Sequence, residues 1–336
     1  MKNFHRNPAS AFFLIFLLIA MACNLPARLL ASPTAEIATA RLTDQPVVLV
    51  SATHAELPTE TSTPSSPTPE LPTPTVGISH VLVPNTTVKS GELIHDAVSV
   101  DTAVEKRAPY GDSYDMNRFE RPFLQDMTYV PDLDIESYNL SKDEKFYFVS
   151  IKLVGSDPNN EIGINYGVEL DLDADGFGDY IIIAHPPYSV DWTTENVQVV
   201  QDTNRDTGGL SPMLSDAPLP GDGYDMVIFD GGRGSGDDPD LAWVRINAGR
   251  DATVQFAFKL GLAENRFMYG VIADAGPKNI ADLDYVDRFT EAEAGSPETN
   301  EEFYPLKALY AVDNVCREAF GFTGTGIEPQ RCPPKP

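Results

Sequence analysis

Short apolar segments separated by turn-forming residues are the feature that most limits how this chain can fold. FYFVSIKLV (146–154) is rich in aromatic and β-branched residues, and YGVELDL (166–172) alternates so that its apolar side chains share one face. Clusters of Gly, Pro, Asp or Asn bound each segment, a pattern typical of an all-β fold, and we expect a single large antiparallel β-sandwich. Only residues 301–320 carry a weak helical spacing. Further segments of the strand kind are 180–185, 196–202, 224–230, 241–247, 252–262 and 266–274.

The N-terminus has the pattern of an export signal. Two basic residues precede an unbroken apolar run, AFFLIFLLIAMA (11–22), which is shorter than the roughly 20 residues that a spanning helix needs and has the length of a signal-peptide core. The run ends in IAMAC, which resembles the lipobox of bacterial lipoproteins, although Ala20 stands where leucine is usual. The resemblance implies that residues 1–22 are a lipoprotein signal peptide and that Cys23 is lipid-modified. We therefore expect an exported chain anchored to the cell membrane, facing the outside or the periplasm, with ordinary secretion or an uncleaved anchor as alternatives.

The composition changes after the signal. LPTETSTPSSPTPELPTPT (57–75) is a Pro/Thr/Ser tract with almost nothing to bury, so it cannot offset the entropy of ordering, and its prolines favour extended polyproline II. Residues 23–75 are predicted to be a disordered stalk that reaches about 100 Å when extended. Residues 76–336 are predicted to be the folded head.

Charge and cysteine content agree with an exported protein. The formal net charge of −26 argues against nucleic acid and anionic membrane surfaces as partners, and it suits a protein that binds cations. If Cys23 carries lipid, Cys316 and Cys332 remain as a pair. We expect them to form a disulfide in an oxidising compartment, and two free buried thiols are the alternative.

ELDLDADGFGDY (169–180) crowds four aspartates into one loop between two predicted strands. The loop begins like an EF-hand, but Ile182 stands where a bidentate glutamate would be, and strands flank it. It therefore resembles the shorter DxDxDGxxD calcium loops of extracellular β proteins. Carboxylates this close repel one another unless a cation neutralises them, so we expect Ca²⁺, with a solvated acidic turn as the alternative. The expected ligands are Asp171, Asp173, Asp175, the backbone carbonyl of Phe177, and Asp179, with Gly176 allowing the tight turn.

Two further acidic loops follow predicted strands. QDTNRDTGG (201–209) is a candidate second metal site, with Arg205 expected to project outward, although a polar turn explains the sequence equally well. FDGGRGSGDDPDLAW (229–243) has irregular spacing and is interpreted as a loop first. We expect all three loops to gather at one edge of the sandwich. The residues concerned are Asp202, Asn204 and Asp206 in the second loop and Asp230, Asp237, Asp238 and Asp240 in the third.

No catalytic residue is predicted. Nucleophile-elbow, zinc-protease and phosphate-loop motifs are absent from the sequence, and acidic residues are too numerous to single out a glycosidase pair. His185, at a strand end, is interpreted as structural. For glycan binding, Tyr188 and Trp192 flank the turn PPYSVDW and form the expected stacking platform, with simple packing of the loop as the alternative. Trp243 is expected in the core.

Ala108 to Leu153 carries a family resemblance. A Gly/Asp-rich entry, then PDLDI with a nearby tyrosine, a polar turn and FYFVSIKL resemble the first half of family-9-like carbohydrate-binding and DOMON-like β-sandwiches. The resemblance implies a jelly-roll-like sandwich that binds sugars, or haem in the DOMON branch, which the scarcity of histidine disfavours. The sequence thus predicts a non-catalytic, calcium-stabilised lipoprotein head that binds a partner, with an extracellular glycan as the candidate. A structural envelope protein and, third, a glycan-acting hydrolase are the alternatives.

Overall fold

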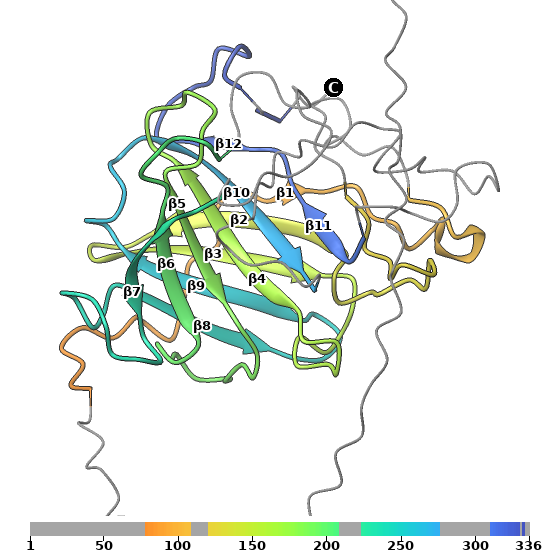
Figure 1. The fold of residues 1–336 in the computed structure, drawn as a ribbon, viewed down its shortest axis with the longest axis horizontal. Helices are drawn as coiled ribbons and strands as arrows, with labels where there is room; N and C mark the ends of the chain where they lie inside the picture. Colours follow the sequence, from red (N-terminus) through yellow and green to blue (C-terminus); the bar gives the residue numbers. More distant parts are fainter. Residues whose placement is uncertain (1–77, 109–119, 208–222, 276–309, 330, 333–336) are drawn as a thin grey trace, which may run out of the picture. The chain divides into compact units, whose positions relative to one another are not determined.

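Two antiparallel sheets packed face to face make up the fold (Figure 1). The computed structural model describes residues 78–108, 120–207, 223–275, 310–329 and 331–332, all within the unit Thr73–Pro336. The predicted signal peptide, Cys23 and the predicted stalk lie outside the described residues. The prediction of an all-β fold with a single antiparallel sandwich is confirmed.

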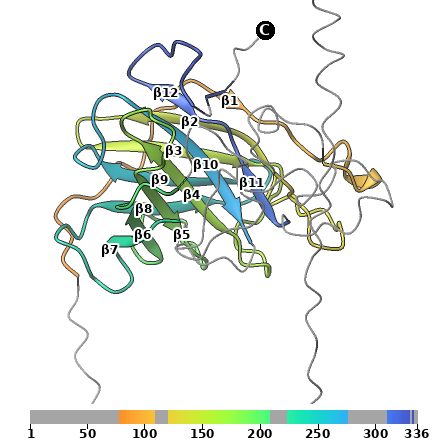
Figure 2. The ribbon, with the colours of Figure 1, turned by 45° about the horizontal axis from the view of Figure 1, so that its top comes forward.

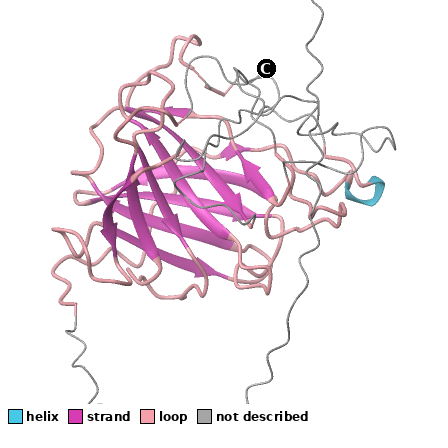
Figure 3. Ribbon diagram, in the orientation of Figure 1, coloured by secondary structure: helices cyan, strands magenta, loops and turns pink. Residues whose placement is uncertain are grey.

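The first sheet has five strands in the order β1-β2-β3-β9-β8, and the second has seven in the order β11-β10-β4-β5-β6-β7, with β12 also paired to β10. Figure 2 shows the same two layers after a 45° turn. Strands dominate the described residues, which include one short 3₁₀ turn, η1 (Ala103–Glu105) (Figure 3). The strands are β1 (Ile94–His95), β2 (Ile135–Lys142), β3 (Phe146–Leu153), β4 (Asn165–Asp171), β5 (Tyr180–Ala184), β6 (Val197–Gln201), β7 (Met226–Asp230), β8 (Ala242–Asn247), β9 (Thr253–Lys259), β10 (Phe267–Asp274), β11 (Val312–Asn314) and β12 (Glu318–Phe320).

The core lies between the sheets and follows from the alternation of the strands. Val168 and Leu170 on β4, Ile182 on β5, and Val254 and Phe256 on β9 are fully buried in one continuous cluster. Their neighbours along each strand point to the opposite face of the sheet. β4 is buried along almost its whole length because it is central in its sheet, with β10 on one side and β5 on the other.

The entry segment (78–89) covers part of the outer face of the five-stranded sheet. Leu82 and Val88 pack, together with Trp192, on a second apolar cluster of Phe146, Phe148, Trp243 and Ala257. Asp240 fixes the segment, because its carboxylate accepts the backbone N–H groups of Val81 and Leu82 at 2.9 and 2.8 Å. The first described residues are thus tied to the loop before β8.

The helical spacing noted at 301–320 does not produce a helix in its described part. Residues 310–320 form β11 and β12, which both pair with β10. Pairing with β10 outweighs a weak local helical preference in segments of three residues. In the residues that the structure describes, no helix has the length and apolarity to cross a membrane.

Cys316 and Cys332 form a disulfide, with Cα atoms 4.9 Å apart and a sequence separation of 16, which confirms the predicted pairing. The bridge ties the C-terminal segment to the end of β11. Tyr138 of the other sheet donates to the Cys316 carbonyl at 3.1 Å, and the Cys332 N–H donates to the Arg317 carbonyl at 2.9 Å.

We expect the double substitution Cys316→Ser and Cys332→Ser to lower the free energy of unfolding by about 3 kcal/mol, because a loop of this size gains chain entropy in the unfolded state when it is opened. Urea unfolding of the oxidised chain and the variant measures the difference. Cys23→Ser is the matched control and should unfold like the parent. An oxidised parent whose stability does not change on reduction would contradict the structural role of the bridge.

Candidate metal centre

The first two acidic loops lie side by side at one end of the seven-stranded sheet. β4 and β5 bound the acidic hairpin (residues 171–179), and β6 leads into the second loop (202–207), because Tyr180 pairs with Gln201 across β5 and β6. Backbone hydrogen bonds join the two loops: the Gly178 N–H donates to the Thr207 carbonyl, and the Asp202 N–H donates to the Asp179 carbonyl, both at 3.0 Å. The pairing of adjacent strands therefore brings together two loops that were predicted separately.

Three of the predicted metal ligands converge in the acidic hairpin. Asp171, Asp173 and Asp179 each offer one carboxylate oxygen, and these oxygens all lie within 4.8 Å of one another. Asp171 also shapes the turn, because its carboxylate accepts the N–H groups of Asp175 at 3.2 Å and Gly176 at 3.0 Å. Asp179 accepts the Leu172 N–H at 2.5 Å. The hairpin thus holds its carboxylates inward through its own backbone.

A buried arginine anchors this hairpin to the C-terminal segment. The Arg317 guanidinium, with no exposed surface, donates to both carboxylate oxygens of Glu169 at 3.0 and 2.8 Å and to Asp171 Oδ2 at 2.9 Å. Tyr224 donates to Glu169 Oε1 at 3.0 Å. A Cβ atom at residue 178 would lie 2.2 Å from the Tyr224 hydroxyl, so this packing requires Gly178. Two carboxylates, one guanidinium and one phenol therefore form a connected hydrogen-bond network next to the loop.

Negative charge remains in excess at this end of the sandwich. Burial raises the pKa of Asp171 to about 6, although the Arg317 guanidinium acts in the opposite direction. Burial also raises the pKa of Asp179, and the charges of Asp173 and Asp202 add to the effect. Desolvated carboxylates that face one another favour the neutral form, and a bound cation reverses that preference. The group of Asp171, Asp173 and Asp179 therefore has the donor chemistry of a hard cation site.

The structure gives Asp175 and Phe177 contacts of a different kind. Asp175 pairs with the Arg205 guanidinium from the second loop, and Arg205 also lies over the Phe177 ring, 5.7 Å from its centroid. The Arg205 side chain leaves its own loop and is 61 % exposed, and in addition it contacts a carboxylate and a ring face of the neighbouring hairpin, which the sequence did not predict. Asp175 is not one of the three residues whose carboxylate oxygens converge, and the Arg205 guanidinium also lies 3.9 Å from Asp173 Oδ2. The Phe177 carbonyl stays a predicted ligand.

The contacts of the second loop favour the polar-turn alternative. Asp202 Oδ1 accepts the N–H groups of Asn204 and Arg205, and its Oδ2 accepts that of Thr207. Asn204 donates its side-chain amide to Asp206 at 2.9 Å. Asp202 thus caps its own turn and supports the acidic hairpin through the backbone.

The third acidic loop lies at the opposite end of the sheet, so the prediction that all three loops gather at one edge is wrong. β7 runs antiparallel to β6, with Asp230 opposite Gln198, and the chain leaves β7 far from the acidic hairpin. Three carboxylates of this loop have partners in the described residues: Asp230 accepts from Gln198 at 2.7 Å, Asp238 pairs with Lys259 at 2.6 Å, and Asp240 contacts His80 at 2.8 Å.

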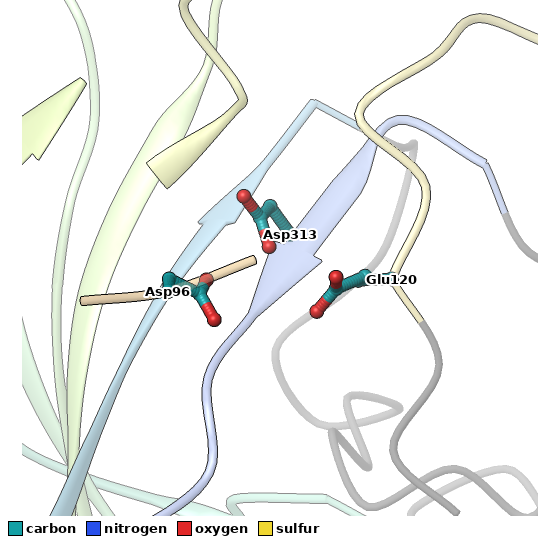
Figure 4. Close-up of side chains that lie close together, drawn as sticks. All are labelled: Asp96, Glu120 and Asp313. Atoms are coloured by element: carbon teal, nitrogen blue, oxygen red, sulfur yellow. The ribbon is translucent and has the colours of Figure 1, made fainter. Parts of the chain in front are cut away.

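Sequence reasoning missed a second group of converging carboxylates. Asp96 after β1, Glu120 and Asp313 on β11 come from three segments and turn toward one another (Figure 4), with one oxygen from each within 4.8 Å of the others. Glu120 and Asp313 are 1 % exposed, and Asp313 Oδ2 accepts the Ile135 N–H at 2.6 Å. No local motif marks this group, because its members are far apart in the sequence.

Tyr188 and Trp192 do not form the expected platform. Tyr188 is 6 % exposed and donates its hydroxyl to the carbonyls of Ile164 and Ala184, at 2.7 and 2.9 Å. Its ring belongs to the core because the turn that carries it folds back over the end of the sandwich. Trp192 is half-buried on the other side of the turn, with its indole N–H donated to the Asn85 carbonyl at 3.0 Å.

His185 has the contacts of a structural residue. Its ring nitrogens lie 3.0 Å from Asn165 Oδ1 and 3.4 Å from Gln198 Oε1, side chains of the strands on either side of β5.

Comparison of the chain with known protein families, curated proteins and solved structures finds no match. A function is therefore proposed from the sequence and from the arrangement of the side chains alone.

Replacing Arg317 with methionine should lower the free energy of unfolding by about 3–5 kcal/mol, because Glu169 and Asp171 would stay buried without their counter-charge. Arg205→Met is the matched control, since it also removes an arginine that contacts this hairpin. That side chain is 61 % exposed, so its loss should cost about 0–1 kcal/mol. Equal losses in the two variants, measured by urea unfolding, would contradict the role given to Arg317.

Proposed function

We propose that this chain is a non-catalytic cell-envelope lipoprotein whose head is a calcium-stabilised β-sandwich and serves as a binding module. The observation that carries the proposal is the convergence of Asp171, Asp173 and Asp179 in a hairpin of DxDxDGxxD sequence. Calcium takes six to eight oxygen ligands from flexible loops. Three carboxylates in one acidic hairpin supply the core of such a set, and water and backbone carbonyls complete it.

Calcium rather than magnesium suits this hairpin. Magnesium demands near-ideal octahedral geometry and holds several waters, whereas calcium accepts irregular ligand sets. Asp171 already accepts bonds from Arg317 and from two backbone N–H groups, so its position is set by the fold and cannot adjust to a small ion. The loop is a constitutive brace in this proposal, because weak extracellular sites are filled at the calcium levels outside cells.

The remaining parts of the proposal rest on the sequence. The IAMAC motif supports lipid attachment at Cys23, and the Pro/Thr/Ser tract supports a stalk that holds the head away from the membrane. The net charge of −26 supports a cation-rich exported setting and disfavours nucleic acid as a partner. A head of this kind presents its loops to ligands outside the cell.

Calcium at 10 mM should raise the free energy of unfolding of the full-length chain by about 1.4–2.7 kcal/mol relative to excess EGTA, for a site with Kd of roughly 10⁻⁴–10⁻³ M. Thermal and urea unfolding with and without the ion measure the effect. Asp173→Asn should remove most of the gain, because Asp173 is a proposed ligand and is 60 % exposed, so its loss disturbs the fold little. Asp237→Asn, an exposed aspartate of the third loop, is the matched control. A parent chain that unfolds alike in calcium and EGTA would exclude the brace.

Cys23→Ser should abolish labelling of the chain by an alkyne palmitate analogue and release it from the membrane fraction, because a thioether-linked lipid needs the thiol. The parent should be labelled and should sediment with membranes. A parent chain that sediments with membranes but takes up no label would contradict the lipid anchor and favour an uncleaved signal helix.

A further inference from the structure

A groove of about 810 Å³ lies at the end of β6 and β7 opposite the acidic hairpin. Residues 193–195 before β6, residues 231–236 after β7, and the start of the entry segment (78–80) line it. Its volume is within the range of small-molecule sites, roughly 300–1,000 Å³. Nothing in the proposed calcium brace uses this groove.

The chain has two tryptophans, and both line the groove. Trp243 is 3 % exposed and forms part of the floor, with the His80 ring 4.6 Å away. Trp192 is half-buried at the side, and the Arg245 guanidinium lies 4.5 Å from its ring centroid and fixes it. Trp192 is therefore the aromatic ring that the groove offers to the apolar face of a ligand, and buried Trp243 packs behind it.

Polar groups of both kinds surround these rings. Glu195 supplies an exposed carboxylate and Arg233 a guanidinium whose side chain is 85 % exposed, and Ser79 and Thr193 add hydroxyl groups. Asp240 holds Nδ1 of His80 at 2.8 Å. The Arg233 Nε also lies 3.6 Å from Asp230 Oδ2, and the set contains donors as well as acceptors. Such a lining suits a neutral ligand that is rich in hydroxyl groups.

Among the glycines that line the wall of the groove, the protein's own packing requires Gly231 and Gly236 but not Gly232. Gly231 is required, because a Cβ atom there would lie 1.9 Å from the Thr194 carbonyl oxygen, and Gly236 has φ +109°. Gly232 has an ordinary backbone conformation, and a Cβ atom there would meet nothing closer than 3.6 Å. A bare backbone at this wall allows a ligand to approach it closely.

We propose that this groove binds a neutral saccharide, with the sugar ring against Trp192 and its hydroxyl groups on Glu195 and Arg233. This inference rests on the proposal that the head is a binding module, but not on the calcium site. A proline-rich peptide is the less favoured occupant, because both indole N–H groups are already donated inside the protein, to the Asn85 and Asp240 carbonyls. The net charge of −26 disfavours an anionic glycan.

Intrinsic tryptophan fluorescence of the full-length chain tests the proposal, because both of its tryptophans line the groove. The probes are cellobiose, maltose, xylobiose and chitobiose, with a digalacturonate and a peptide of sequence 57–75 as comparators. We expect a saturable change with at least one neutral disaccharide and none with the comparators. Arg233→Ala and Glu195→Ala should each weaken binding about tenfold, as expected for a lost hydrogen bond to a charged group. Arg250→Ala, an exposed arginine in the turn between β8 and β9, is the control and should bind like the parent.

The outcomes separate this proposal from the calcium brace. The saccharide response should persist in EGTA below the melting temperature of the calcium-free chain, because the groove and the acidic hairpin lie at opposite ends of β6 and β7. No response to any of the four disaccharides would overturn the proposal, and so would equal binding by the parent and both groove variants. A response to the 57–75 peptide alone would instead assign the groove to the chain's own proline-rich tract.

Discussion

The acidic end of this sandwich depends on one buried guanidinium. Arg317 has no exposed surface and contacts Glu169 and Asp171 on the same strand, β4. Burying these charges is costly, and the three hydrogen bonds from the guanidinium to the two carboxylates offset this cost. Removal of the arginine would leave two carboxylates in a dry site. The contact therefore decides whether β4, the acidic hairpin and the C-terminal segment stay together.

The disulfide holds the guanidinium side of this ion pair in place, and the acidic hairpin holds the carboxylate side. Cys316 directly precedes Arg317, so the bridge to Cys332 limits the movement of the segment that carries the guanidinium. On the other side, Asp171 accepts both the guanidinium and the backbone of its own loop. A cation held by Asp171, Asp173 and Asp179 would add a third tie at the same place. Covalent, ionic and proposed metal contacts thus converge on the end of β4. The groove that we propose as a ligand site lies at the opposite end of the sheet, beside β6 and β7.

Sequence patterns predicted the central strands and the loop between β4 and β5, because alternation and acidic spacing are local signals. β2 was missed because a bulge between Ile135 and Ser137 breaks its alternation. Arg317 was missed because it lies 148 residues from Glu169, and no short-range pattern records such a contact. The burial of Tyr188 depends on how its turn folds over the core. The position of the third loop could have been predicted from the sequence. β7 runs antiparallel to β6, so the loop after β7 must lie at the opposite end of the sheet from the loop after β6.

A double-mutant cycle between Arg317 and Glu169 tests the central claim most directly. The free energies of unfolding of the parent, Arg317→Met, Glu169→Gln and the double variant give the coupling energy without the separate effects of each substitution. If the guanidinium holds the acidic end together, the coupling should be about 2–3 kcal/mol in favour of the pair. A coupling below about 0.5 kcal/mol would show that the two side chains are independent and would contradict the account.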